Sequence, residues 1–502
     1  MKAILAMDQG TSSSKAALFT SSGRLLALGR VPIRTSFGAG GSAHQDPREI
    51  LRTQRRAIRI ALRRAGGSVD IVAAGIASQR STFVLWERGT GNPIGPAPTW
   101  QSTEAESVCR RMRRHAAAVR RITGLPLSPH YSASKLSLVL DARRGLRRRA
   151  ERGEVLFGNV ATYLLWHFSG GAMHATDPTH AARTLLLDLA TLDWSPDLLA
   201  LFGVPRAMLP EVRDSLGDFG SLHVENGRAG QAPVRAMLGD QQAALYASAG
   251  AGGARRARGN MALVNYGTGA FVLVPTSGRL VRKRGLLSSV AWTRAGRRCY
   301  LLEGTVNAAG ITLDWLRREL GAPAALEDLD RMCRQAPTGA TEATLLPAFL
   351  GLGSAHMETA GPGATAMAAN LPLRHAVPGL ARAGVEAIAH LVAEIVMLAS
   401  ATTRSAPRRL VASGTLARLD YLVEFQAALL GRGIGVAAQP EATLEGAALA
   451  AARQSGLGRA WPAPRVRWAP VDRQLRRLAL RRHQDWQRLV DLARTWTARG
   501  RR

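Results

Sequence analysis

The chain has few cysteines, few lysines and few aromatic residues, and each shortage excludes a class of protein. Its three cysteines, Cys109, Cys299 and Cys333, are too far apart for the paired spacing of a zinc site or for a disulfide framework. Aromatic residues make up only 5% of the chain. They are not interleaved with basic residues, as they are on many surfaces that bind single-stranded nucleic acid.

Long apolar runs are also missing. No run approaches the roughly 18 residues that a membrane span needs, and Met1 leads into a predicted strand without the apolar core of a signal peptide. We therefore expect a soluble, cytoplasmic protein without a membrane partner. With 502 residues and a hydrophobic content of 46%, the chain is long enough for two packed domains and is not disordered.

Acidic residues are scarce relative to basic ones. The chain has 36 acidic and 67 basic residues, which gives a formal net charge of +31, and only four of the basic residues are lysines. Such an excess favours an anionic partner such as nucleic acid. The arginines are spread over the whole chain, however, so a solvated basic surface is the preferred interpretation. A nucleic-acid partner is not expected.

Two glycine-rich turns stand out among the features that are present. The first follows the apolar strand Ile4–Met7 and reads DQGTSSSK from Asp8, and the second follows Ala262–Val264 and reads NYGTG from Asn265. Backbone N–H groups and hydroxyls in such turns can bind phosphate oxygens. One turn alone is weak evidence, because glycine marks ordinary turns more often than phosphate sites. Two of them, one in each half of the chain, predict a nucleotide held between two domains.

The same order of elements follows each turn. The first half is predicted to contain strands at 3–8, 16–20, 25–31 and 72–78, with a helix at 47–65. The second half is predicted to contain strands at 262–264, 270–274, 285–292 and 299–302, with helices at 308–319 and 378–400. A segment rich in glycine, alanine and arginine at 249–259 is the predicted linker. The pattern indicates an α/β protein with an internal duplication.

Further motifs agree in order and spacing with one family. They are SQRST from Ser78, TWQ from Thr99, TDPTHAARTLLLDLATLDW from Thr176, MLPEVRDS from Met208, GDQQAALYA from Gly239 and LEGTVNAAG from Leu302. Together with the two turns, they make the chain resemble the FGGY carbohydrate kinases, and among these the members that phosphorylate glycerol most closely. The resemblance implies an α/β fold of two ribonuclease-H-like (actin-like ATPase) domains closing over a central cleft. We place these domains at 1–247 and 248–460, with a basic helical tail packed on the second domain at 461–502.

The resemblance also implies a reaction. ATP with Mg²⁺ would be the phosphoryl donor, and a small polyol or sugar would be the acceptor, with conversion of glycerol to glycerol 3-phosphate as the leading candidate. Asp240 would be the general base that takes the proton from the acceptor hydroxyl. Judged from its spacing alone, Asp240 before an apolar helix also reads as an ordinary N-cap. Arg80 would bind the acceptor and stabilise developing charge.

Further site residues are implied by the same motifs. The other acceptor contacts would be Ser81, Trp100, His130, Tyr131 and Gln241. The nucleotide contacts would be Thr11, Ser12, Ser13, Lys15, Gly267, Thr268, Gly310, Asp314, Gly414 and Thr415. Asp8, acting through water, and Asp240 would hold Mg²⁺, which prefers one or two carboxylates together with phosphates.

On the acceptor side, two positions depart from the family pattern. Ser81 replaces an acidic residue that binds a glycerol hydroxyl, and His130, followed by Tyr131, stands where the family has a tyrosine. Loss of a buried carboxylate removes a charged hydrogen bond worth about 1.5–3 kcal/mol. We therefore expect weaker selection of glycerol unless another group compensates.

On the nucleotide side, Ser413-Gly414-Thr415 replaces the family's Asp-Gly-Gly turn, and Leu419 replaces an adenine-contacting asparagine. The stretch from Ala355 to Glu358, with Pro362-Gly363 after it, replaces another family loop. A catalytically weakened or inactive relative with a binding or regulatory role is therefore the alternative to an active kinase. An arginine-rich anion-binding protein is the third possibility. Relatives suggest a homodimer or homotetramer.

Overall fold

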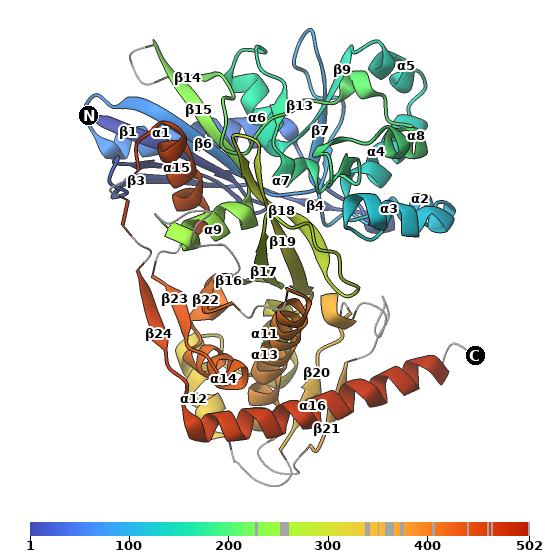
Figure 1. Cartoon of the computed structure of the whole chain (residues 1–502), viewed down its shortest axis with the longest axis vertical. Coiled ribbons are helices and arrows are strands. Elements are labelled where there is room, and N and C mark those ends of the chain that lie inside the picture. The colour runs from blue at the N-terminus through green and yellow to red at the C-terminus, as the bar shows by residue number, and fades with distance from the viewer. Residues whose placement is uncertain are drawn as a thin grey trace.

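The computed structural model describes residues 1–225, 229–250, 261–336, 342–349, 351–356, 366–371, 376–403, 407–438, 441–458, 461–462 and 465–499 (Figure 1). Most of the predicted linker at 249–259 lies outside the described residues. The same is true of 357–365, which contain most of the loop that departs from the family pattern.

The first half of the chain is built on a six-stranded sheet. Its strand order is β14 (Ser221–Glu225), β15 (Ala229–Gly239), β6 (Asp70–Ser78), β1 (Lys2–Gln9), β2 (Ser13–Phe19) and β3 (Leu25–Pro32). Strands β1, β2 and β3 form an antiparallel meander, while β6 and β15 run parallel to β1 and to each other. The glycine-rich turn at Gly10 therefore lies between β1 and β2, at the end of a strand in the middle of the sheet.

Helix α1 (Pro47–Ala65) covers the meander, and its bounds match the prediction. It begins where the Asp46 side chain accepts a hydrogen bond from the Arg48 N–H at 2.9 Å, with Pro47 as the first helical residue. It ends at Gly66, whose φ of 68° is one that side-chain-bearing residues rarely adopt. The buried face of α1 includes Ile50, Ala57 and Ala61.

The second half repeats this plan in a seven-stranded sheet. Its strand order is β18 (Leu287–Arg294), β19 (Arg297–Val306), β17 (Ala270–Ser277), β16 (Met261–Tyr266), β22 (Arg409–Ser413), β23 (Ile434–Ala437) and β24 (Val466–Ala469). Strands β16, β17 and β19 are antiparallel neighbours, while β22 and β23 run parallel to β16. The predicted duplication is thus confirmed in outline: each half has an antiparallel three-strand set, and in each it lies beside two parallel strands, although in the second half β17 pairs with β19 and not with the next strand, β18.

Two alanine-rich helices lie between the sheets (Figure 1). Helix α9 (Asp240–Ala249) follows β15, and α15 (Ala442–Gln454) follows β23. The two helices pack so closely that a Cβ on Gly446 would lie 1.8 Å from the Ala243 carbonyl oxygen. A Cβ on Gly75 of β6 would lie 2.2 Å from the Ala447 carbonyl oxygen. One continuous apolar cluster therefore joins the two halves.

The first half also contains a set of shorter elements, and the predicted acceptor residues Trp100, His130 and Tyr131 lie between some of them. Its helices are α2 (Glu106–Arg111), α3 (Ala116–Thr123), α4 (Ser132–Ala142), α5 (Leu146–Glu151), α6 (Val160–Phe168), α7 (Pro178–Ala181) and α8 (Pro196–Phe202). Its strands are β4 (Ser36–Phe37), β5 (Ala43–Gln45), β7 (Phe83–Glu87), β8 (Ala97–Pro98), β9 (Val155–Asn159), β10 (Ala175–Thr176), β11 (Leu187–Asp188), β12 (Asp193–Trp194) and β13 (Glu211–Val212).

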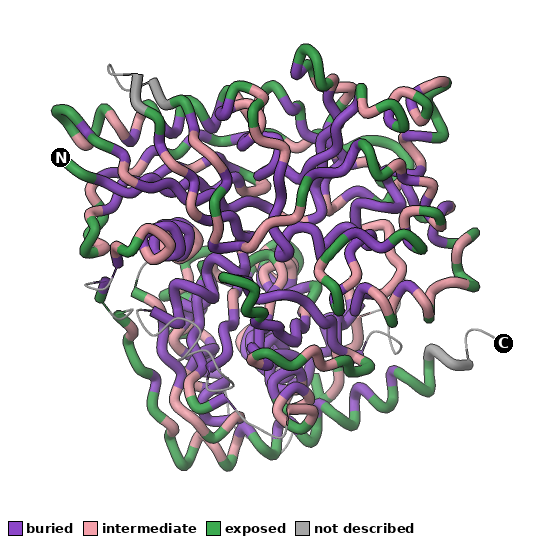
Figure 2. Tube along the Cα trace, turned by 45° about the horizontal axis from the view of Figure 1, so that its top comes forward, coloured by how far each residue is buried: buried purple, intermediate pink, exposed green. Residues whose placement is uncertain are grey.

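The second half adds a helical layer. It consists of α11 (Gly310–Leu320), α12 (Leu326–Gln335), α13 (Ala376–Thr403), α14 (Asp420–Leu430) and α16 (Arg473–Arg499), with the short strands β20 (Thr344–Leu346) and β21 (Met367–Ala369). Helix α16 packs against α14 and β20. Exposed residues recur along its length, whereas α13 is largely buried (Figure 2).

Helix α13 corrects one expectation. The segment Val377–Thr403 has the length and composition of a membrane span, so the expectation that no apolar stretch is long enough is wrong. In its most apolar 18-residue stretch, however, 78% is buried inside the protein. The helix is apolar because it lies in the core of the second half, where Ile388, Val392 and Val396 are buried.

Candidate active site

The first glycine-rich turn is fixed by hydrogen bonds to residues of the acceptor side. The Gly10 N–H donates to the Ser13 carbonyl at 3.0 Å. The Thr11 hydroxyl accepts from the Trp100 indole N–H at 2.9 Å and donates to the Gln79 side chain at 3.3 Å. Ser12 is exposed and Ser13 is buried. The turn and the predicted acceptor residue Trp100 therefore form one connected unit.

A carboxylate lies buried just before this turn. Asp8 is 5% exposed, and its Oδ2 lies 3.7 Å from the Lys15 ammonium. Burial raises the pKa of Asp8 to about 7, although Lys15 opposes this shift. Lys15 itself is 2.6 Å from the Glu441 carboxylate, which precedes α15. Oδ1 of Asp8 is buried and has no hydrogen-bond partner, so it is available to another group.

Arg80 joins the two halves of the molecule. Its guanidinium donates two hydrogen bonds, at 2.9 and 3.1 Å, to the two oxygens of Glu303, which lies on β19 of the second sheet. Arg183, from the first half, forms an ion pair with the same carboxylate. All three side chains are at most 8% exposed. Burial alone would raise the pKa of Glu303, but the two arginines outweigh it and hold the pKa below its usual range.

Asp240 lies beside this cluster at the first residue of α9. Its Oδ1 is 3.3 Å from Nε of Arg80 and accepts from the Gln241 N–H at 2.7 Å. The N-cap of α9 is Gly239, so the N-cap interpretation of Asp240 is wrong. The Gly239 N–H donates to the Thr179 hydroxyl at 2.7 Å, which fixes the backbone just before the carboxylate. Burial raises the pKa of Asp240, and Arg80 partly opposes this effect.

Three aromatic rings stand next to these charges. The ring centroids of Trp100 and His130 are 5.6 Å apart, and those of His130 and Tyr131 are 4.9 Å apart. Burial, together with nearby cations that include Lys135 and Arg183, holds the pKa of His130 well below its usual range, so the imidazole is neutral. His130 and Tyr131 therefore both belong to this aromatic wall.

Ser81 takes a strained conformation beside the same wall. Its φ is 65°, which is uncommon for a residue with a side chain. The hydroxyl donates to the Arg183 carbonyl at 3.3 Å, and the residue is 3% exposed. The Ser81 hydroxyl is thus already hydrogen-bonded within the protein.

The second glycine-rich turn meets two other backbone segments. The Gly310 N–H, at the start of α11, donates to the Gly267 carbonyl at 3.0 Å, and a Cβ on Gly310 would lie 3.1 Å from Cα of Thr268. Gly414, which follows β22, has a φ of 89°, and a Cβ there would lie 2.2 Å from the Tyr266 carbonyl oxygen. The predicted residues Gly267, Thr268, Gly310 and Gly414 therefore come together.

Other predicted nucleotide residues lie at the edge of this group or outside it. Thr415 is exposed at the start of a short 3₁₀ helix, Thr415–Arg418. Asp314, one turn into α11, pairs with Arg317 at 3.2 Å, and its side chain is 60% exposed. Leu419 is fully buried in the apolar core of the second half, which explains why an apolar residue is tolerated there.

A direct hydrogen bond connects the acceptor and nucleotide segments. The Asn265 side chain donates to the Gln241 side chain at 3.0 Å. Asn265 is the second-last residue of β16 and lies beside Gly414, and Gln241 follows Asp240. The predicted acceptor residue Gln241 is therefore bound by the other half of the molecule.

Sequence reasoning assigned no role to Arg183, Glu303, Glu441 or Asn265. Glu303 and Arg183 lie inside motifs that carried the family resemblance. A signal was present for Glu303, because a single carboxylate inside the apolar part of β19, from Cys299 onward, needs a buried partner. No comparable pattern marked Glu441.

Family models match both halves of this arrangement. The N-terminal domain of the FGGY family of carbohydrate kinases matches residues 3–247, and the C-terminal domain of the same family matches residues 262–455. The chain belongs to this family. It is 40% identical to a glycerol kinase of Thermus brockianus over 510 aligned positions, covering 100% of both chains. It is 38% identical to a glycerol kinase of Alkalilimnicola ehrlichii, covering 99% of both.

Solved structures of FGGY kinases share the fold. The Plasmodium falciparum glycerol kinase with ADP superposes with a TM-score of 0.87 at 23% identity, covering 98% of both chains. A ligand-bound xylulose kinase from Lactobacillus acidophilus gives a TM-score of 0.83 at 19% identity, also covering 98% of both. This FGGY protein therefore has the predicted fold of two actin-like domains. It is a carbohydrate kinase similar to glycerol kinases.

Proposed function

We propose that this FGGY kinase transfers the γ-phosphoryl group of ATP to a hydroxyl of a small polyol, with glycerol as the leading acceptor. The single observation that carries the proposal is the position of Asp240. Its carboxylate lies at the junction of the two halves, 3.3 Å from Arg80, and the next residue is hydrogen-bonded to Asn265 beside the second glycine-rich turn. A base at this junction can reach an acceptor held by the first half and a nucleotide held by the second.

In the proposed reaction, Asp240 accepts the proton of the attacking hydroxyl. The raised pKa makes its carboxylate a stronger base than an exposed aspartate, closer to the pH at which proton transfer is most efficient. Arg80 forms an ion pair with the Asp240 carboxylate and would stabilise the negative charge that develops on the acceptor oxygen as its proton leaves. Trp100, His130 and Tyr131 supply an apolar wall for the carbon chain of the acceptor.

The nucleotide phosphates would be held mainly by the backbone. The backbone of Gly310 approaches that of Gly267 and Thr268 so closely that a side chain at Gly310 would obstruct it. From the opposite turn, Ser12 would offer its exposed hydroxyl and N–H group and Thr11 its N–H group, because the Thr11 hydroxyl already donates to Gln79. Most of catalysis would then come from positioning and from stabilising charge, as in other phosphoryl transfers.

The residues present fit a magnesium ion that is held together with the phosphates. Among the described residues, no cluster of three or more His, Cys, Asp or Glu could hold a metal by itself. The unpartnered Oδ1 of Asp8 is the group available for such an ion, through water, with Asp240 as the second carboxylate. When bound, Mg²⁺ would neutralise phosphate charge.

Ser81 supports the alternative of a weakened or non-glycerol kinase. Its hydroxyl is already bound to the Arg183 carbonyl, so it does not replace the missing carboxylate. An acceptor with a different pattern of hydroxyls is the second candidate. The domain bounds at 247 and 460, a cytoplasmic location and a homodimeric or homotetrameric state remain predictions.

A coupled ADP-release assay over glycerol, tetritols, pentitols, ketoses and dihydroxyacetone tests the proposal. We expect release with at least one small polyol. If no acceptor stimulates ADP release while ATP still binds, the inactive alternative is favoured.

Asp240→Asn tests the base directly. We expect turnover to fall by more than about 100-fold, because amide cannot accept the proton, while ATP affinity stays nearly unchanged. The measurement is kcat with the best acceptor together with calorimetric ATP binding. Turnover above about one part in a hundred would show that Asp240 is not the base.

A further inference from the structure

Lys135 is a buried lysine outside the residues assigned above. It lies on α4 and is 0% exposed. Its ammonium donates to the Thr99 carbonyl at 2.7 Å and to the His130 carbonyl at 2.9 Å. Burial lowers the pKa of Lys135 to about 7, and the nearby Glu104 and Cys109 oppose this effect. Burying a lysine costs desolvation free energy, which these two hydrogen bonds offset.

The two carbonyls belong to the two segments that carry the aromatic wall. Thr99 precedes Trp100, and His130 is itself a member of the wall and precedes Tyr131. Each segment is also bound elsewhere in the first half. The Trp100 N–H donates to Thr82 at 3.2 Å, and the Ser132 hydroxyl donates to the Ser81 carbonyl at 3.2 Å. Lys135 joins the two segments to each other.

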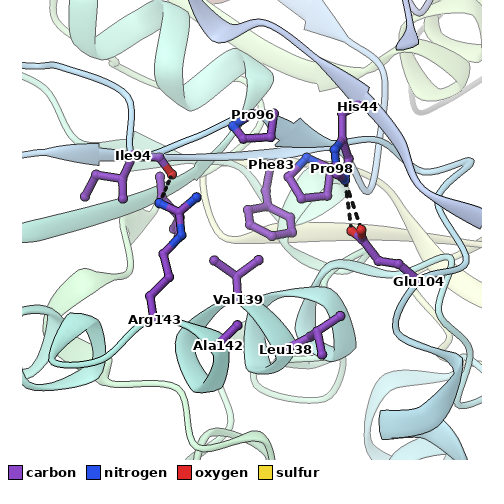
Figure 3. A pocket seen from close by; sticks show the side chains of 11 residues that line it. His44, Phe83, Ile94, Pro96, Pro98, Glu104, Leu138, Val139, Ala142 and Arg143 are labelled. Atoms are coloured by element: carbon purple, nitrogen blue, oxygen red, sulfur yellow. Dashed lines mark hydrogen bonds and ion pairs between the residues drawn. The ribbon is translucent and has the colours of Figure 1, made fainter. Parts of the chain in front are cut away.

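Side-chain packing next to this link is incomplete. A cavity of about 240 Å³ separates the segment containing Pro98 and Glu104 from α4, where it is lined by Leu138, Val139 and Ala142 (Figure 3). Glu104 is directed to His44, with 3.0 Å between them, at one edge of the cavity. Apolar contact across the cavity is limited. Hydrogen bonds such as that from Lys135 to the Thr99 carbonyl therefore contribute more to holding this segment against α4.

We propose that Lys135 is a positioning residue for acceptor binding, holding Trp100 and His130 at the spacing that the acceptor requires. The proposal rests on the proposed function, because it assigns the aromatic wall to the acceptor. It predicts an effect on acceptor binding that is separable from effects on the base and on the nucleotide. Even a neutral amine keeps two N–H donors, so removal of the side chain, rather than titration, is the decisive change.

Lys135→Met keeps the length and apolar stem of the side chain and removes the donors. We expect the acceptor KM to rise at least about tenfold, while kcat and the KM for ATP change less than about twofold. Lys135→Gln retains an amide donor, so its acceptor KM should be intermediate. The matched control is Leu138→Ala on the same helix, which enlarges the cavity and lowers the Tm without moving the acceptor KM.

Hydrogen exchange of the unliganded protein separates failure of this inference from failure of the proposed function. We expect faster exchange at 97–104 and 128–133 in Lys135→Met than in the wild type or in Leu138→Ala, whether or not the protein phosphorylates a polyol. Unchanged exchange and an unchanged acceptor KM would overturn the inference. A fall in kcat together with similar rises in the KM for the acceptor and the KM for ATP would also overturn the inference, because that pattern indicates general damage to the fold. If Lys135→Met does not fold, Lys135→Gln is judged by the same criteria.

Discussion

The two sides of the candidate site differ in the kind of interaction that forms them. The predicted acceptor side consists of charged side chains: Arg80 and Arg183 are buried, Asp240 is 28% exposed, and the buried Glu303 reaches across from the second half. The nucleotide side consists of close backbone approaches at Gly310 and Gly414. The two sheets share an order of six strands, and the second adds β18 at its edge, so the difference arises from the residues at the strand ends and from the segments added to the first half, which include Arg183.

This contrast shows how each side responds to change. Buried charges interact over several ångströms and respond to the loss of any partner, because the remaining charge is left unpaired at low dielectric. Backbone approaches respond to added volume and are insensitive to charge. Substitutions on the two sides should therefore separate acceptor kinetics from nucleotide kinetics.

Glu303→Gln removes the charge that joins the halves and should give the largest effect. It leaves the guanidinium groups of Arg80 and Arg183 buried without their carboxylate. We expect kcat/KM for the acceptor to fall about 100-fold, because Arg80, which already lies 3.3 Å from Asp240, then has no other carboxylate partner and lowers the basicity of Asp240 further. Steady-state kinetics at saturating ATP measure the change.

A second buried cluster provides the control. Glu386 of α13 is also paired with two arginines, Arg382 at 2.9 Å and Arg482 of α16. Glu386→Gln should destabilise the protein to a similar degree and leave kcat/KM near the wild-type value, because this cluster lies within the second half. Equal losses of activity in both variants would mean that the Glu303 cluster acts only through stability.

Gly414→Ala tests the nucleotide side and should give a smaller effect. The added methyl meets the Tyr266 carbonyl at 2.2 Å in a backbone conformation with φ at 89°, so the turn must shift. We expect the KM for ATP to rise about tenfold with little change in acceptor KM. Gly321→Ala is the control, since its φ is 67° but nothing lies within 4 Å of the new methyl. An equal effect of Gly321→Ala on ATP would argue against a local contact.

How far the sequence predicts this protein depends on the range of the interactions. Helix α1 is predictable at both ends, because Asp46, Pro47 and Gly66 are local signals. The duplicated meanders were predictable because strand alternation and turns are local as well. Convergence of Gly267, Gly310 and Gly414 followed only from the family resemblance.

The ion pairs of the site could not be predicted from the sequence. Glu303 meets Arg80 and Arg183 across 223 and 120 residues, respectively, so no sequence period relates them. Their contact depends on the packing of α9 and α15 between the sheets. The ion pair between Lys15 and Glu441 also depends on this packing, because Glu441 directly precedes α15. The sequence had suggested that Lys15 would contact phosphate.

Titration of Asp8 extends the comparison from kinetics to stability. Because burial raises its pKa from 3.8 to about 7, the folded protein binds more protons than the unfolded chain between these pH values. The contribution of Asp8 to stability therefore falls as pH rises from about 4 to about 7, by at most about 4 kcal/mol. Asp8→Asn removes this titration, so its Tm should exceed that of the wild type by several degrees more at pH 8 than at pH 5, in the absence of nucleotide and Mg²⁺. Gly414→Ala, which changes no charge, should show the same Tm difference from the wild type at both pH values. A difference between Asp8→Asn and the wild type that does not vary with pH would mean that Asp8 ionises normally in the folded protein.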